Sequence, residues 1–120
     1  MAHYLIEVGY TPQSWSSQID KPASPIDRIS PALAACGGTL QCLYYAFGEI
    51  DVVGVIDFPA PEDAAAFALA IGSSGALRLF RTTPLLSVDQ GLESLRRAGE
   101  IRGTYAPPLT VSVVDQPART

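Results

Sequence analysis

Aromatic residues occur at two places in the sequence where they could line a binding pocket. Tyr10 and Trp15 follow one apolar run, and Tyr44 and Tyr45 lie within another. Each of these rings combines an apolar body with a polar atom, so together they could roof a small apolar pocket and hydrogen-bond to its contents. Core packing or a contact between subunits would explain at least two of them equally well.

Two charged residues could supply polar recognition in the same pocket. Asp51 follows a predicted turn, where its carboxylate could bind a ligand amine, although accepting hydrogen bonds from turn N–H groups is the favoured role. Arg78 could bind a ligand carboxylate, and a solvated position on a strand edge is the favoured alternative. We therefore predict a ligand-binding set that consists of Tyr10, Trp15, Tyr44, Tyr45, Asp51 and Arg78.

Catalytic chemistry has few candidates in this sequence. His3 is the only histidine and could act as a base, but a surface position is the favoured interpretation, and the spacing of metal ligands is missing. Lys21 is the only lysine and follows no glycine pair, which excludes a P-loop. Gly72-Ser73-Ser74-Gly75 lacks the spacing of a nucleophile elbow. We predict no cofactor and no metal, and we assign no catalytic residue.

The composition sets the class of protein. The 120 residues are 48% hydrophobic and carry a net charge of −4, which favours one domain and argues against nucleic-acid binding. Met1 to Glu7 resembles neither a signal sequence nor a membrane anchor, so we expect a cytoplasmic location without membrane association. Cys36 and Cys42 lack CxxC spacing and are expected to be thiols in the core.

The first part of the chain predicts a strand followed by short helices. Residues 3–10 are a β-prone run that stops at Thr11-Pro12. Prolines between residues 12 and 36 make one long helix implausible. Ser24-Pro25 predicts the start of a helix, Pro31 should kink or restart it, and Gly37-Gly38 should end it.

The next part predicts a hairpin, a helix and a strand. Residues 40–47 and 52–58 are β-prone and flank the turn Gly48–Asp51, which indicates antiparallel pairing. Proline and two acids open an alanine-rich helix over residues 61–71. Residues 76–83 predict another strand, and Ser87 to Gln90 resembles a capping box that starts a short third helix.

This order of elements predicts an α+β fold: a ferredoxin-like βαββαβ domain over residues 1–100, with a four-stranded antiparallel sheet and a short extra C-terminal helix. Helices would cover one face of the sheet, and the apolar residues on the other face predict a homo-oligomer. Residues 101–120 are expected to be a proline-containing tail. The tail could add an edge strand over residues 109–114. Disorder of residues 115–120 is an alternative that stays open.

The middle of the sequence resembles the GYD-domain family of small bacterial proteins. The resemblance rests on Gly37 to Glu62 and on the alanine-rich helix, Gly-Ser turn and Arg/Thr strand that follow, and it covers about residues 4–98. The motif that names the family falls on Gly48-Glu49-Ile50-Asp51, with Ile50 in place of its tyrosine. The resemblance implies a dimeric α/β barrel and no established reaction. A more distant likeness is to the effector-binding domains of Lrp/AsnC regulators.

Three functions stay open on these grounds. The favoured one is a homo-oligomeric binding or accessory domain for a small organic molecule. The second is a cofactor-independent oxygenase or isomerase of the dimeric α/β-barrel type, with His3, a tyrosine or Asp51 as its base. The third is a purely structural self-assembly protein. A cavity beneath Tyr10, Tyr44 and Tyr45 would argue against the third, and His3 or Asp51 inside it would favour the second.

Overall fold

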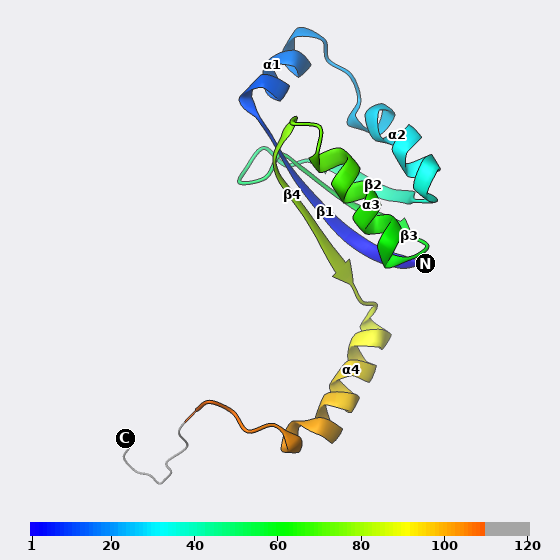
Figure 1. Ribbon diagram of the computed structural model, residues 1–120, viewed down its shortest axis with the longest axis vertical. Coiled ribbons are helices and arrows are strands. Elements are labelled where there is room, and N and C mark those ends of the chain that lie inside the picture. Colours follow the sequence, from blue (N-terminus) through cyan, green and yellow to red (C-terminus); the bar gives the residue numbers. More distant parts are fainter. Residues whose placement is uncertain (110–120) are drawn as a thin grey trace. The chain divides into compact units, whose positions relative to one another are not determined.

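A four-stranded antiparallel sheet and three helices make up residues 1–86 (Figure 1). The computed structural model describes residues 1–109. In chain order its elements are β1 (Ala2–Tyr10), α1 (Pro12–Asp20), α2 (Pro25–Cys36), β2 (Thr39–Tyr45), β3 (Val52–Phe58), α3 (Pro61–Gly72), β4 (Leu77–Leu85), α4 (Val88–Ile101) and a 3₁₀ turn (Arg102–Thr104). Residues 110–120 of the predicted tail, with most of its predicted edge strand over residues 109–114, lie outside the described residues.

The strands follow the order β2-β3-β1-β4, and every neighbouring pair is antiparallel. β1 and β3 are therefore the central strands, with α1 and α2 inserted between β1 and β2 and α3 between β3 and β4. This is the split βαβ arrangement of ferredoxin-like domains, so the predicted fold class is confirmed. Assembly of two such sheets into a barrel stays a prediction.

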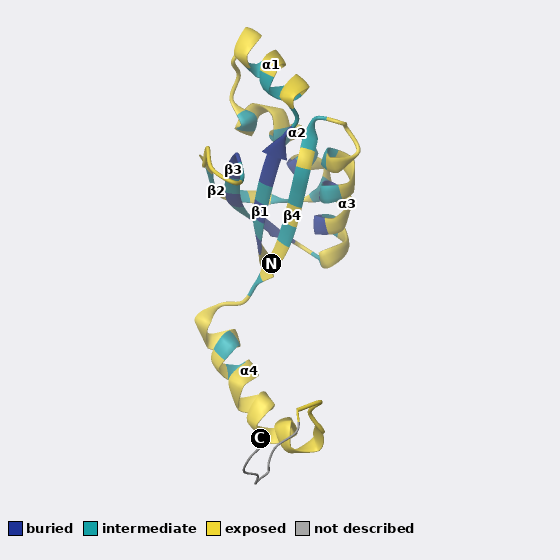
Figure 2. Ribbon diagram, turned by 90° about the vertical axis from the view of Figure 1, so that its left-hand side faces the viewer, coloured by how far each residue is buried: buried dark blue, intermediate teal, exposed yellow. Residues whose placement is uncertain are grey.

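Alternating side chains of the two central strands form the core (Figure 2). One set of strand residues faces the helices and packs against one residue of α2 and two of α3. The buried core consists of Tyr4, Ile6, Val8, Tyr10, Leu33, Val52, Ile56, Phe58, Ala64 and Phe67. On the opposite face Leu5, Val53 and Val55 are only half-buried, and within residues 1–86 no helix covers them.

Polar caps and prolines start the first two helices, and the start of α2 was predicted from the sequence. The Thr11 hydroxyl accepts a hydrogen bond from the Ser14 N–H at 3.1 Å, and Pro12 is the first residue of α1. The Ser24 hydroxyl accepts a hydrogen bond from the Ile26 N–H at 3.2 Å, and Pro25 is the first residue of α2. The expected restart at Pro31 is wrong, because α2 continues unbroken through it. Pro31 removes only one helical hydrogen bond, and it lies on the exposed side of the helix, where water can replace that bond.

Both outer strands of the sheet are irregular. The pairing of β2 with β3 shifts register between Leu40 and Cys42, and the intervening Gln41 side chain donates a hydrogen bond to Asp57 at 2.6 Å. The pairing of β4 with β1 shifts register between Gly9 and Tyr10. Pro84 has no N–H group, so it interrupts the row of backbone donors along β4. Each edge of the sheet is therefore bent or incomplete.

The helix α4 belongs to a second unit that begins at Ser87, and it is described by itself. It starts with the predicted capping box: the Ser87 hydroxyl accepts from the Gln90 N–H at 3.1 Å, and the Gln90 side chain accepts from the Ser87 N–H at 2.8 Å. The predicted domain boundary at residue 100 stays a prediction. None of the helices in residues 1–109 is long and apolar enough to cross a membrane.

Candidate functional site

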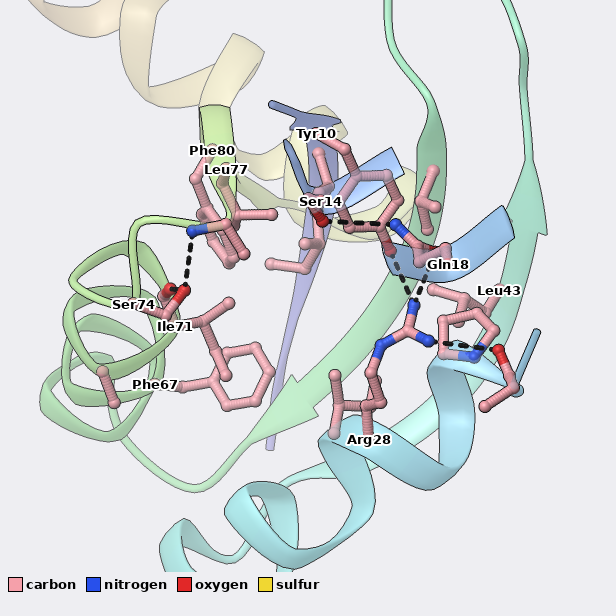
Figure 3. A pocket seen from close by; sticks show the side chains of 18 of the residues that line it. Tyr10, Ser14, Gln18, Arg28, Leu43, Phe67, Ile71, Ser74, Leu77 and Phe80 are labelled. Atoms are coloured by element: carbon pink, nitrogen blue, oxygen red, sulfur yellow. Dashed lines mark hydrogen bonds between the residues drawn. The ribbon is translucent and has the colours of Figure 1, made fainter. Parts of the chain in front are cut away.

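A cavity of about 500 Å³ lies between the sheet and the helices of residues 1–86 (Figure 3). We call it the interlayer cavity. Its walls come from the helix-facing side of the sheet and from α1, α2 and α3. The apolar part of the lining consists mainly of Ile6, Val8, Ile29, Leu43, Val52, Ile56, Phe67, Ile71, Leu77 and Phe80. Its volume and lining are typical of sites that bind small organic molecules.

Packed aromatic rings fix the wall that α3 contributes. The Phe67 ring lies 5.5 Å from the Phe58 ring and 6.3 Å from the Phe80 ring, centroid to centroid. Ile71 follows Phe67 by one helical turn, and Figure 3 shows the two side chains next to each other at the cavity. Because Phe58 is fully buried, this wall is held by the core and is preformed.

Polar side chains from α1 and α2 meet at the opposite side of the cavity (Figure 3). The Arg28 guanidinium donates hydrogen bonds to the Tyr10 hydroxyl at 3.2 Å, to Gln18 Oε1 at 3.1 Å and to the Ala23 carbonyl at 3.1 Å. Gln18 in turn donates to the Ser14 hydroxyl at 3.3 Å. This chain of contacts connects α1 and α2 to the end of β1 and holds the guanidinium in one orientation.

The charged side chains that line the interlayer cavity are all positive. Arg28 and Lys21 are the charged residues of its lining, and no carboxylate lines it. All three acceptors of Arg28 are neutral groups, and within residues 1–109 neither cation forms a salt bridge. The cavity therefore combines an apolar interior with uncompensated positive charge at its polar side.

Four of the six predicted ligand-binding residues surround a second hollow. Tyr10, Trp15, Asp51 and Arg78 line a shallower space of about 550 Å³ with Pro12, Ser16 and Ile19. Tyr10 is shared with the interlayer cavity, and its ring packs edge-on against Trp15 at 5.0 Å. Whether these residues bind a ligand stays a prediction.

Asp51 holds the turn between β2 and β3 against the end of β1. Its carboxylate accepts from the Tyr10 N–H at 2.8 Å and pairs with the Arg78 guanidinium at 3.4 Å. Its own N–H donates to the Val8 carbonyl at 2.8 Å. Arg78 also donates to the Glu49 carbonyl at 3.0 Å. These bonds give Asp51 and Arg78 a structural role, and they leave the pair close to neutral in total charge.

Tyr44 and Tyr45 lie away from the interlayer cavity. Tyr44 lies opposite Val53 on the uncovered face of the sheet and is 66% exposed. Tyr45 stacks on Phe47 at 5.2 Å, and Phe47 lies 6.0 Å from Trp15. The structure therefore brings the four aromatic residues together only in part, and neither tyrosine of β2 roofs the cavity.

His3 has partners that the sequence analysis missed. Its Nδ1 contacts the carboxylate of Asp57, which lies opposite it in the pairing of β1 with β3. Asp57 is buried and also accepts a hydrogen bond from Gln41. A carboxylate that orients an imidazole in this way is found beside catalytic histidines, but this group lies outside the interlayer cavity. A role of His3 as a base stays a prediction.

Comparison with known proteins identifies the family of the chain. The family profile for the GYD domain matches residues 4–95. This chain belongs to the GYD-domain family. No curated protein matches it. One solved structure, described as "crystal structure of FFRP-DM1", is similar to it with 14% identity and a TM-score of 0.48, over 72% of this chain and 100% of that chain.

The GYD motif forms the turn that Asp51 anchors. The Gly48 N–H donates to the Ile50 carbonyl at 3.0 Å, and the Ala46 N–H donates to the Asp51 carbonyl at 2.9 Å. The left-handed residue of this turn is Phe47, with φ of 51°, and not Gly48. Ile50, at the position where the resemblance places the tyrosine of the motif, is half-buried.

The polar side of the interlayer cavity in this GYD domain was missed from the sequence. Ser14 and Gln18 are one helical turn apart, which is a weak signal by itself. Arg28 comes from another helix, and only the folded structure shows that its side chain reaches Gln18. Within residues 1–109, no three His, Cys, Asp or Glu side chains come close enough to hold a metal ion.

Proposed function

We propose that this GYD-domain protein binds a small organic molecule in the interlayer cavity. The observation that carries the proposal is a preformed space of about 500 Å³ that is apolar inside and polar at one side. Apolar cavities hold water poorly because water needs several polar partners. A ligand with an apolar body would remove the apolar lining of the cavity from contact with water, which is favourable.

The arrangement supports binding more directly than catalysis. The polar groups of the cavity are hydroxyls, an amide, a lysine and an arginine, which recognise and orient a molecule. The one histidine and Asp57 lie elsewhere. We therefore propose that the protein binds an effector or a metabolite, as expected for an accessory domain.

Analysis of the purified protein tests the proposal. Native mass spectrometry should detect a recurrent small molecule bound to the chain, and mass spectrometry after denaturation should identify it. A panel of metabolites should contain at least one that raises the melting temperature, because a ligand that binds only the folded state stabilises it. Repeatedly empty preparations with no thermal shift across the panel would contradict the proposal.

We also propose that the protein is a homo-oligomer that forms through the uncovered face of the sheet. Leu5, Val53 and Val55 form a half-buried apolar strip there, and the opposed residues Glu7 and Arg81 add both signs of charge. A surface with both signs can pair with its own copy across a two-fold axis. Light scattering should give a mass of at least twice the 12.7 kDa of one chain, and a monomer at micromolar concentration would contradict this.

A cytoplasmic location fits the same proposal. Cys36 and Cys42 are free thiols in the described structure, and a reducing compartment would keep them in that state.

A further inference from the structure

We propose that the ligand of the interlayer cavity is an apolar molecule with one anionic group, and that Arg28 binds that group. The inference rests on the proposed function and adds the chemical class of the ligand. A carboxylate and a phosphate monoester share the chemistry that the site requires, since a guanidinium binds both through paired N–H groups.

The charge balance of the cavity favours an anionic ligand. A ligand that enters it meets Lys21 and Arg28 and no acidic side chain. A cationic ligand would place like charges together in a partly desolvated space, which is unfavourable. A neutral apolar ligand would leave both cations without a counter-ion, whereas an anionic group would offset part or all of their charge.

The hydrogen bonding of Arg28 leaves N–H groups available for an anionic ligand. A guanidinium has five N–H groups, and three hydrogen bonds occupy at most three of them, all with neutral acceptors. At least two N–H groups therefore stay available for a ligand oxygen. The bonds to Tyr10 and Gln18 hold the group in place before binding, so little side-chain entropy is lost when an anion binds.

Arg28 lies where the cavity meets solvent. The residue is exposed as a whole, yet it lines the cavity from α2. An anionic group bound there keeps contact with water while the apolar body extends towards Phe67, Ile71 and Phe80 (Figure 3). This division of the site fits an amphipathic molecule.

A comparison with Arg78 shows why the second hollow is a poorer anion site. Arg78 pairs with Asp51 at 3.4 Å, so its charge is compensated within the chain. Arg28 has no such partner in residues 1–109. The two arginines therefore differ in the free energy that an added anion would gain.

Ligands with one apolar chain and different head groups test the inference on the unmodified protein. Titration calorimetry below micelle concentrations would compare decanoate, decyl phosphate, decanol and decylammonium. We expect decanoate or decyl phosphate to bind about tenfold or more tightly than decanol, as expected for a hydrogen-bonded charge pair, and decylammonium to bind most weakly. Equal affinity of decanol and both anions would overturn the inference and leave the proposed function standing. Failure of all four to bind would also overturn the inference, whereas the proposed function would fall only if purified preparations were empty and no metabolite of the panel gave a thermal shift.

Variants locate the anion contact. Arg28→Met should weaken binding of the preferred anion about tenfold or more and leave decanol binding unchanged, while Arg28→Lys should retain part of the preference because it keeps the charge. Arg97→Met on α4 is the matched control, since Arg97 is 74% exposed and outside the cavity lining. An anion preference that survives in Arg28→Met, with the fold intact by circular dichroism, would overturn the role of Arg28.

Discussion

Tryptophan in place of Ile71 should abolish most ligand binding to the interlayer cavity. Ile71 lies half-buried on α3 and lines the cavity one turn after Phe67. A larger side chain at this position extends into space that is empty in the unmodified protein, so it should remove ligand volume without the strain of overpacking a full core. The neutral dye N-phenyl-1-naphthylamine, followed by its fluorescence, should bind about tenfold or more weakly, which corresponds to about 1.4 kcal/mol or more.

The control for this variant lies on the same helix. Leu69 is 73% exposed and does not line the cavity, so Leu69→Trp adds the same side chain on the outer side of α3. Dye affinity should be unchanged in this variant. If both variants bound the dye equally well, the dye would be binding elsewhere on the protein, and the interlayer cavity would lose its support as the ligand site.

Alanine in place of Gly54 should destabilise the domain by about 3 kcal/mol, near the upper end for the insertion of a methyl group into a packed site. A Cβ atom at this position would lie 2.6 Å from the Cys42 carbonyl oxygen and 2.7 Å from Leu43 Cδ1. The carbonyl belongs to the backbone of β2, so it can move only if the pairing of β2 with β3 changes. Urea unfolding followed by circular dichroism would measure the loss.

Gly48 provides the matched comparison for Gly54. A Cβ atom at Gly48 would have no neighbour within 4 Å, and its φ is not positive. Gly48→Ala should therefore change the free energy of unfolding by less than about 0.5 kcal/mol, as is usual for an exposed site without special geometry. A large loss in Gly48→Ala, or a negligible one in Gly54→Ala, would show that the register of the hairpin differs from the one described.

The fold was predictable because its local signals agree with one another. Ser24-Pro25 and the Ser87 capping box mark helix starts by chemistry that acts within four residues. The strand β3 was predicted over the residues that form it, since Gly48–Asp51 and Pro59 punctuate both of its ends. Where a local signal failed, at Pro31, the loss of a single hydrogen bond was outweighed by the packing of Leu33 in the core.

The candidate site was less predictable because it depends on contacts between distant residues. Arg28 and Tyr10 are 18 positions apart, and His3 and Asp57 are 54 apart. The first contact depends on where α2 lies relative to the end of β1, and the second depends on the register of β1 against β3. The aromatic residues were chosen by type and by their place beside predicted strands. Neither criterion distinguishes Tyr10, at the cavity, from Tyr44, on the uncovered face.

The irregular outer strands of the sheet affect the behaviour of the protein at high concentration. Fibril growth requires a flat, continuous row of free N–H and C=O groups that a further chain can extend. The register shift beside Gln41 bends one border, and Pro84 removes a donor from the other. Ribbon-like polymerisation through these edges is therefore disfavoured, which agrees with the proposed association through the uncovered face of the sheet.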